Sequence, residues 1–106
     1  MNKCVIIGNL TRKPELRSTQ EGVPVCNFTV AVNRHKKREG QPDADYFRVT
    51  AWRALGELCA RYLDKGRKVM VCGLVSARAY TGADKVVYAA LELVADEVEF
   101  LSPMER

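Results

Sequence analysis

The chain lacks the residue spacing that zinc sites and disulfide frameworks need. Its 106 residues contain one histidine, His35, and four cysteines far apart in the sequence: Cys4, Cys26, Cys59 and Cys72. No C-x-x-C pair is present and no cysteine lies near the histidine, so a zinc site does not fit. Each cysteine has an apolar neighbour in the sequence, as is typical of free thiols that pack in a core. We therefore expect reduced, core-packed cysteines and neither a metal nor another cofactor.

The residue sets that catalysis requires are also missing. The sequence offers no nucleophile with a base, no metal cluster and no glycine-rich phosphate cradle, and His35 stands in a polar connection without an identifiable partner. The apolar run in "MNKCVIIGNL" is too short for a signal peptide or a membrane span. We expect no catalytic residues, no membrane contact, and a cytoplasmic, nucleoid-associated protein.

Positive charge is in modest excess. Seventeen Lys and Arg residues stand against 13 Asp and Glu residues, which gives a net charge of +4. This balance suits a protein that meets polyanions, although the same balance is common on surfaces that only confer solubility. With 47% hydrophobic residues, the chain has the length and composition of one domain, residues 1–106, with its own core.

Hydrophobic periodicity predicts three strands, one helix and two further strands. The strands are expected at residues 2–10, 25–34, 43–52, 68–80 and 86–100, with a short extended piece at 15–17. The helix is expected over 53–64. Its apolar face would consist of Leu55, Leu58, Cys59, Tyr62 and Leu63. Gly73 indicates a bend or bulge in the fourth strand. This order fits an all-β fold, the five-stranded Greek-key OB-fold barrel, with one α-helix between the third and fourth strands.

The first predicted strand has no polar face along its centre. Cys4, Val5, Ile6 and Ile7 are apolar on both parities, which is typical of a strand covered on both sides. We expect a second layer of the chain, or another subunit, to cover the second side.

The stretch "DADYFRVTAW" raises the question of function. Read as a strand, it places apolar Phe47, Val49 and Ala51 on one face, and aromatic and basic side chains, including Tyr46 and Trp52, on the other. Outward aromatic residues can cover an apolar edge or a subunit interface, and a basic run can be a solvated loop. As a set on one sheet, however, such residues favour single-stranded nucleic acid, because bases stack on rings while cations follow phosphates. The predicted DNA-binding residues are Arg34, Lys36, Lys37, Tyr46, Arg48, Trp52, Arg53, Arg78, Tyr80, Lys85 and Tyr88.

Four stretches carry a family resemblance across nearly the whole chain. They are "NKCVIIGNLTRKPELR", "FTVAVNR", "ADYFRVTAWRALGELCARYLDKG" and "VCGLVSARAYTG". Together they resemble the bacterial single-stranded DNA-binding protein family. The resemblance implies an OB-fold that assembles as a homotetramer and wraps single-stranded DNA during replication, repair and recombination. It also implies stacking positions at Tyr46, Trp52 and Tyr80, and a basic position at Arg48.

Two departures from the family pattern lead to further expectations. After "AVN", where the family often carries an aromatic residue, this chain reads "RHKK", so binding is expected to depend more on salt-sensitive contacts. The sequence stops at "FLSPMER", where family members typically continue into an acidic tail. We therefore expect it to bind DNA without capturing the replication partners that the tail recruits.

Two other binding proteins are alternatives. One is a tail-less dimeric OB protein of the primosomal replication protein N type, which acts mainly through protein contacts. The stretches "PELR" and "YLDKG" favour the first family over it. The other is a cold-shock-like RNA binder.

Overall fold

The computed structural model describes residues 1–35, 39–40 and 43–102. Within these residues the chain forms six strands and one helix. In chain order they are β1 (Cys4–Leu10), β2 (Glu15–Ser18), β3 (Pro24–Asn33), β4 (Ala44–Trp52), α1 (Arg53–Tyr62), β5 (Lys68–Thr81) and β6 (Val87–Phe100). The predicted succession of strands and helix is confirmed, and the extended piece expected at 15–17 forms the additional short strand β2.

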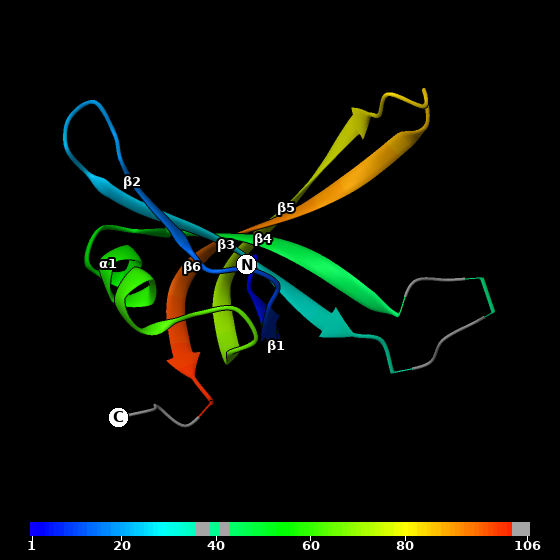
Figure 1. Cartoon of the computed structure of the whole chain (residues 1–106). Helices are drawn as coiled ribbons and strands as arrows, with labels where there is room; N and C mark the ends of the chain where they lie inside the picture. The colour runs from blue at the N-terminus through cyan, green and yellow to red at the C-terminus, as the bar shows by residue number, and fades with distance from the viewer. Residues whose placement is uncertain (36–38, 41–42, 103–106) are drawn as a thin grey trace.

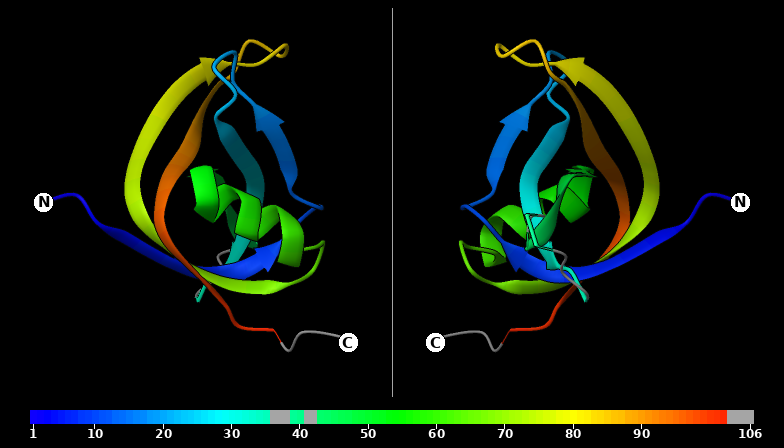
Figure 2. Two further views of the ribbon diagram at one scale, coloured as in Figure 1. Left: turned by 90° about the vertical axis from the view of Figure 1, so that its left-hand side faces the viewer. Right: turned by 90° about the vertical axis from the view of Figure 1, so that its right-hand side faces the viewer.

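The strand pairings close into a ring. In the order β1-β5-β6-β4-β3, each strand pairs with the next, and β3 pairs again with β1 through Asn9 opposite Ala31 and Leu10 opposite Val30. The pairing of β4 with β6 is parallel and the others are antiparallel. β2 lies outside the ring on the edge of β3. This is the predicted OB-fold architecture, with α1 across one end of the ring (Figure 2).

The interior of the ring is apolar. Alternate residues of β3, β4, β5 and β6 point inward, and the most deeply buried of them include Val30, Val49, Val71 and Leu93. Three cysteines, Cys26, Cys59 and Cys72, are buried as expected. Cys4 is half-buried and packs against the core, and all four thiols are free.

The face predicted for the helix is only partly buried. Cys59 and Leu63 are buried and Leu55 packs against the core, but Leu58 and Tyr62 are exposed. Gly56, which lies outside the predicted face, is buried, and a Cβ atom there would lie 2.4 Å from the carbonyl oxygen of Ala51. The buried stripe therefore runs through a glycine, and a pattern of large apolar residues does not detect it.

Strand β1 is covered on one side only within the described chain. Ile6 is buried, but Val5 and Ile7 are 60% and 51% exposed. The expected second layer over β1 is thus not supplied by the described residues of the same chain.

A bulge interrupts the pairing of β5 with β6 at the point where β5 leaves β1. The register passes from Cys72 opposite Glu97 to Gly73 opposite Ala95, which leaves Asp96 without a partner in the register. The predicted irregularity at Gly73 is confirmed, with the extra residue on the neighbouring strand. Beyond it, β5 and β6 continue as a long hairpin. Figure 1 shows this hairpin and the β3–β4 hairpin projecting from the body on the same side.

Candidate nucleic-acid interface

The outward face of β4 has the composition that the sequence predicted. Phe47, Val49 and Ala51 turn toward the core, while Tyr46 and Arg48 are exposed. The neighbouring positions on β3 are small, because Ala31 lies opposite Tyr46 and Thr29 lies opposite Arg48. The side chains of Tyr46 and Arg48 therefore extend beyond those of their neighbours on β3 and are accessible to a ligand.

A groove opens between the two projecting hairpins. It has a volume of about 770 Å³, and six of the predicted DNA-binding residues line it: Arg34, Tyr46, Arg48, Arg78, Tyr80 and Tyr88. Small residues, among them Ala44, Ala89 and Ala90, line it as well. We call this hollow the hairpin groove. It combines aromatic rings and guanidinium groups, the combination to which bases and phosphates bind.

Two tyrosines form a stacked pair on the β5–β6 hairpin. Tyr80 and Tyr88 lie directly opposite each other in the register, with ring centroids 5.6 Å apart and ring planes 26° apart. They remain 48% and 41% exposed. This distance is that of an offset stack, so the pair presents aromatic surface to the groove.

The cations of the hairpin groove differ in their partners. Arg34 forms an ion pair with Asp45 at 2.8 Å, and Arg78 forms one with Glu92 at 3.1 Å. Arg48 has no carboxylate within ion-pair distance among the described residues. A phosphate near Arg48 would therefore displace no competing carboxylate.

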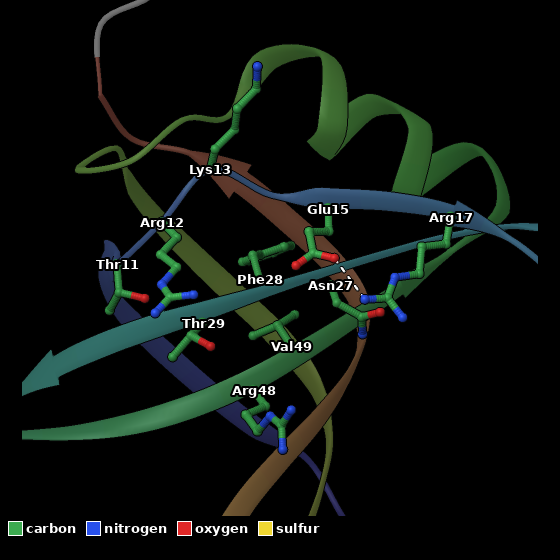
Figure 3. A pocket seen from close by; sticks show the side chains of 10 residues that line it. All are labelled: Thr11, Arg12, Lys13, Glu15, Arg17, Asn27, Phe28, Thr29, Arg48 and Val49. Carbon is green, nitrogen blue, oxygen red and sulfur yellow. Dashed lines mark hydrogen bonds and ion pairs between the residues drawn. The ribbon is translucent and has the colours of Figure 1, made fainter.

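A second hollow, which the sequence did not predict as a site, lies beside the first. It has a volume of about 500 Å³, and its lining includes Arg12, Lys13 and Arg17 from the segment between β1 and β2 and from β2 itself. Figure 3 shows Arg12 and Arg48 on the same side of the sheet, with the Lys13 side chain directed away from them. We call this hollow the loop hollow. The signal for it in the sequence was the group of basic residues in "TRKPELR".

Arg17 is partly neutralised in the loop hollow. Its guanidinium donates a hydrogen bond to Glu15 at 2.8 Å. This bond holds the pKa of the Glu15 carboxyl below its ordinary value, because it stabilises the charged form. Arg12 has no ion pair among the described residues. Its charge is therefore more available to a ligand than the charge of Arg17.

The two hollows adjoin each other. Thr29 and Arg48 line both of them, so together the hollows reach from the β5–β6 hairpin across β4 and β3 to the segment before β2. An extended chain with a repeating anionic backbone fits such a path better than a compact ligand does.

The remaining predicted site residues lie elsewhere. Trp52 shares the outward parity of β4 but lines neither hollow, and it lies opposite Val25. Arg53 begins α1 with a φ of 60°, and Lys85 lies at the tip of the β5–β6 turn with a φ of 65°. Lys36 and Lys37 lie outside the described residues.

Potential metal ligands do not cluster in the described ranges. No group of three or more His, Cys, Asp or Glu residues there lies close enough to hold a metal ion. No helix among the described residues has the length and apolar character that a membrane crossing requires.

Comparisons with known proteins identify the family of this chain. The model of the single-strand binding protein family matches residues 1–101. The single-stranded DNA-binding protein 2 of Clostridium acetobutylicum is 41% identical over 95% of this chain and 77% of its own length. The single-stranded DNA-binding protein of Caldanaerobacter subterraneus subsp. tengcongensis is 40% identical over 97% of this chain and 69% of its own length. The single-stranded DNA-binding protein 3 of Listeria innocua is 46% identical over 100% of this chain and 67% of its own length. The chain therefore belongs to the single-strand binding protein family.

Proposed function

We propose that this protein binds single-stranded DNA along the hairpin groove and the loop hollow. The observation that carries the proposal is that the two hollows adjoin each other at Arg48 and Thr29. Aromatic rings lie on one side of this junction and basic side chains on both. The membership of the chain in the single-strand binding protein family supports the same ligand, and does not favour the primosomal alternative.

The chemistry of the path favours single strands over duplexes. Tyr46, Tyr80 and Tyr88 offer ring faces, and only unpaired bases can stack on them, because a duplex keeps its base faces inside the helix. Stacking does not depend on base identity, since every base has a π-face. The protein thus binds with little sequence preference and protects single strands that arise in DNA replication, repair and recombination.

Assembly of several copies belongs to the same proposal. Val5 and Ile7 form an exposed apolar stripe on β1, and their register partners on β5 are Cys72 and Met70, which share that face. Burial of this stripe against a second copy would remove apolar surface from water. The number of copies, four, follows the family resemblance. The protein acts as a non-catalytic homotetramer in the cytoplasm, at the nucleoid.

The ligand class is tested by titration with labelled oligonucleotides. Fluorescence anisotropy would compare a DNA strand, the RNA strand of the same sequence and the DNA duplex. We expect the DNA strand to bind most tightly. Preference for RNA would favour the cold-shock-like alternative, and equal binding of the duplex would contradict the stacking mechanism. Quenching of Trp52, the only tryptophan, would show in the same titration that the path continues along β4.

A further inference from the structure

The turn between β5 and β6 holds a carboxylate against the stacked tyrosine pair. The hydroxyl group of Tyr88 donates a hydrogen bond to Oδ2 of Asp84. The other carboxylate oxygen, Oδ1, accepts a hydrogen bond from the backbone N–H of Val86 at 3.0 Å. One acidic side chain thus connects the backbone of the turn to the ring that stacks on Tyr80.

Gly82 leaves space for the Tyr88 ring and the Asp84 carboxylate. A Cβ atom at Gly82 would lie 2.9 Å from Cε2 of Tyr88 and 2.9 Å from Oδ1 of Asp84. The absence of a side chain there lets the ring edge and the carboxylate approach the turn. Tyr88 is therefore held on its face by Tyr80 and at its hydroxyl group by Asp84, and Gly82 leaves room for the edge of its ring.

Closure of the turn does not depend on the Asp84–Tyr88 bond. The N–H of Gly82 donates to the carbonyl of Val86 at 2.9 Å, and the N–H of Lys85 donates to the carbonyl of Gly82 at 3.0 Å. Thr81 and Val87 pair directly below the turn. These backbone bonds already define the end of the hairpin. The hydrogen bond between Asp84 and Tyr88 is therefore not needed to close the turn.

The charge of Asp84 is unfavourable for a surface that binds a polyanion. A carboxylate close to a phosphate path repels it, and this repulsion lowers affinity. A compensating role is to hold an aromatic ring in place before the ligand arrives, because ordering a mobile side chain during binding costs free energy.

We propose that Asp84 is a positioning residue, which acts through the Tyr88 hydroxyl group to hold Tyr80 and Tyr88 as a preformed stacking platform for a base. This inference rests on the proposed function and adds to it a determinant of affinity that itself makes no contact with DNA. The Tyr88 hydroxyl group donates its hydrogen bond to Asp84, so the aromatic surface of the pair is the part offered to the ligand.

The test compares variants that differ only in the hydrogen bond. Asp84→Asn and Asp84→Ala both remove the charge, but only the asparagine keeps an oxygen that can accept from the Tyr88 hydroxyl group, with its amide NH2 group then facing the N–H of Val86. With an oligothymidylate as the probe, we expect Asp84→Asn to bind at least as tightly as the parent. Asp84→Ala should bind about 2- to 10-fold more weakly than Asp84→Asn, the range expected for ordering one side chain. Equal affinities of the two variants would overturn the proposal.

A double-mutant cycle separates positioning from an effect on the turn. Tyr88→Phe keeps the ring and the bond between Asp84 and Val86 but removes the hydroxyl group. We expect Tyr88→Phe to weaken binding about as much as the loss of the Asp84 acceptor does, and Asp84→Ala to cost little more in that background. An undiminished cost of Asp84→Ala in the Tyr88→Phe background would mean that Asp84 acts on the turn alone, and would overturn the proposal.

Two further measurements complete the experiment. Asp96→Ala removes an equal charge from the exposed bulge of β6 and reports the effect of net charge; we expect no loss of affinity.

Asp84 raises the pKa of the Tyr88 phenol, because the hydrogen bond favours its protonated form. An absorbance titration of the parent minus Tyr88→Phe should show this raised pKa, and a Tyr88 phenol that ionises at the ordinary pH would contradict the hydrogen bond. A parent protein that binds no single-stranded DNA would instead overturn the proposed function, and this inference with it.

Discussion

Arg48 on β4 lies directly opposite Thr29 on β3, and these two residues line both hollows of the outward face. The small threonine leaves the arginine side chain exposed at the junction of the path. No carboxylate of the described residues lies within ion-pair distance of it. Any strand that occupies both hollows must therefore pass beside the Arg48 side chain.

Replacement of Arg48 should change the salt dependence of binding. If Arg48 contacts one phosphate, Arg48→Ala should lower the slope of log K against log salt concentration by roughly 0.7, the value for one contact on a single strand. The measurement is a set of DNA titrations at several salt concentrations. Arg61→Ala, which removes an exposed arginine of α1 that lines neither hollow, is the matched control and should leave the slope unchanged. The same slope in parent and Arg48→Ala protein would exclude the phosphate contact.

The loop hollow should matter only for longer strands. Arg12 lies beyond Arg48 along the path, so a strand confined to the hairpin groove does not reach it. Arg12→Ala should weaken binding of an oligothymidylate of about 15 nucleotides and leave one of about 5 nucleotides unaffected, lengths that bracket the sites of OB-folds. Equal losses for both lengths would argue against a path that runs from one hollow into the other.

The apolar stripe of β1 should control assembly. Ile7→Glu places a charge on a side chain that is half exposed in the single chain and would be buried between copies, where an unpaired charge is strongly unfavourable. Light scattering at micromolar concentration should give the mass of a tetramer for the parent and a lower mass for the variant. Leu58→Glu, at an exposed leucine of α1, should not change the mass. A monomeric parent would refute the assembly.

Buried thiols should make the fold sensitive to alkaline pH. Burial raises the pKa of Cys26 from 9.0 to about 11 and that of Cys59 to about 12, because the thiolate is poorly solvated in the core. The unfolded chain then loses these protons at lower pH than the folded chain does. Their contribution to stability is complete below pH 9.0 and falls as the pH rises toward the folded pKa values.

Denaturant unfolding at several pH values checks this expectation. The free energy of unfolding of the parent should decline above pH 9.0, the unfolded pKa of both thiols. In Cys59→Ala protein the decline should be shallower, because one of the two thiols is gone. An equally steep decline in both proteins would assign the pH dependence to other groups.

Much of the fold could be predicted from local patterns. Strict alternation in β3 and β4 has one physical cause, a sheet with one face toward the core, and the faces of Phe47 and Tyr46 followed from it. The bulge near Gly73 was also visible, because glycine in a strand permits a close approach of backbones. The helix face was only partly visible, since the buried Gly56 carries no apolar signal and the exposed Leu58 carries one.

The candidate site was only partly visible in the sequence, because its two halves are formed differently. The hairpin groove uses residues that alternate along strands, and these were predicted as DNA-binding residues. The loop hollow depends on β2 pairing with the edge of β3, which brings Arg12 and Arg17 beside Arg48 from a distant part of the chain. Only the closed ring of strands creates this proximity. The position of Trp52 beyond both hollows likewise depends on the three-dimensional course of β4.

The most direct test of the central claim compares two exposed tyrosines on different faces. Tyr46 lines the hairpin groove and is 56% exposed, whereas Tyr62 on α1 is 39% exposed and lines neither hollow. The measurement is the affinity for an oligothymidylate, with thermal unfolding of each variant as a check on folding. Tyr46→Ala should weaken binding by ~1–3 kcal/mol, the free energy of stacking one base, and Tyr62→Ala should leave it unchanged. Unchanged affinity of folded Tyr46→Ala protein, or an equal loss in both variants, would contradict the assignment of the DNA path to this face.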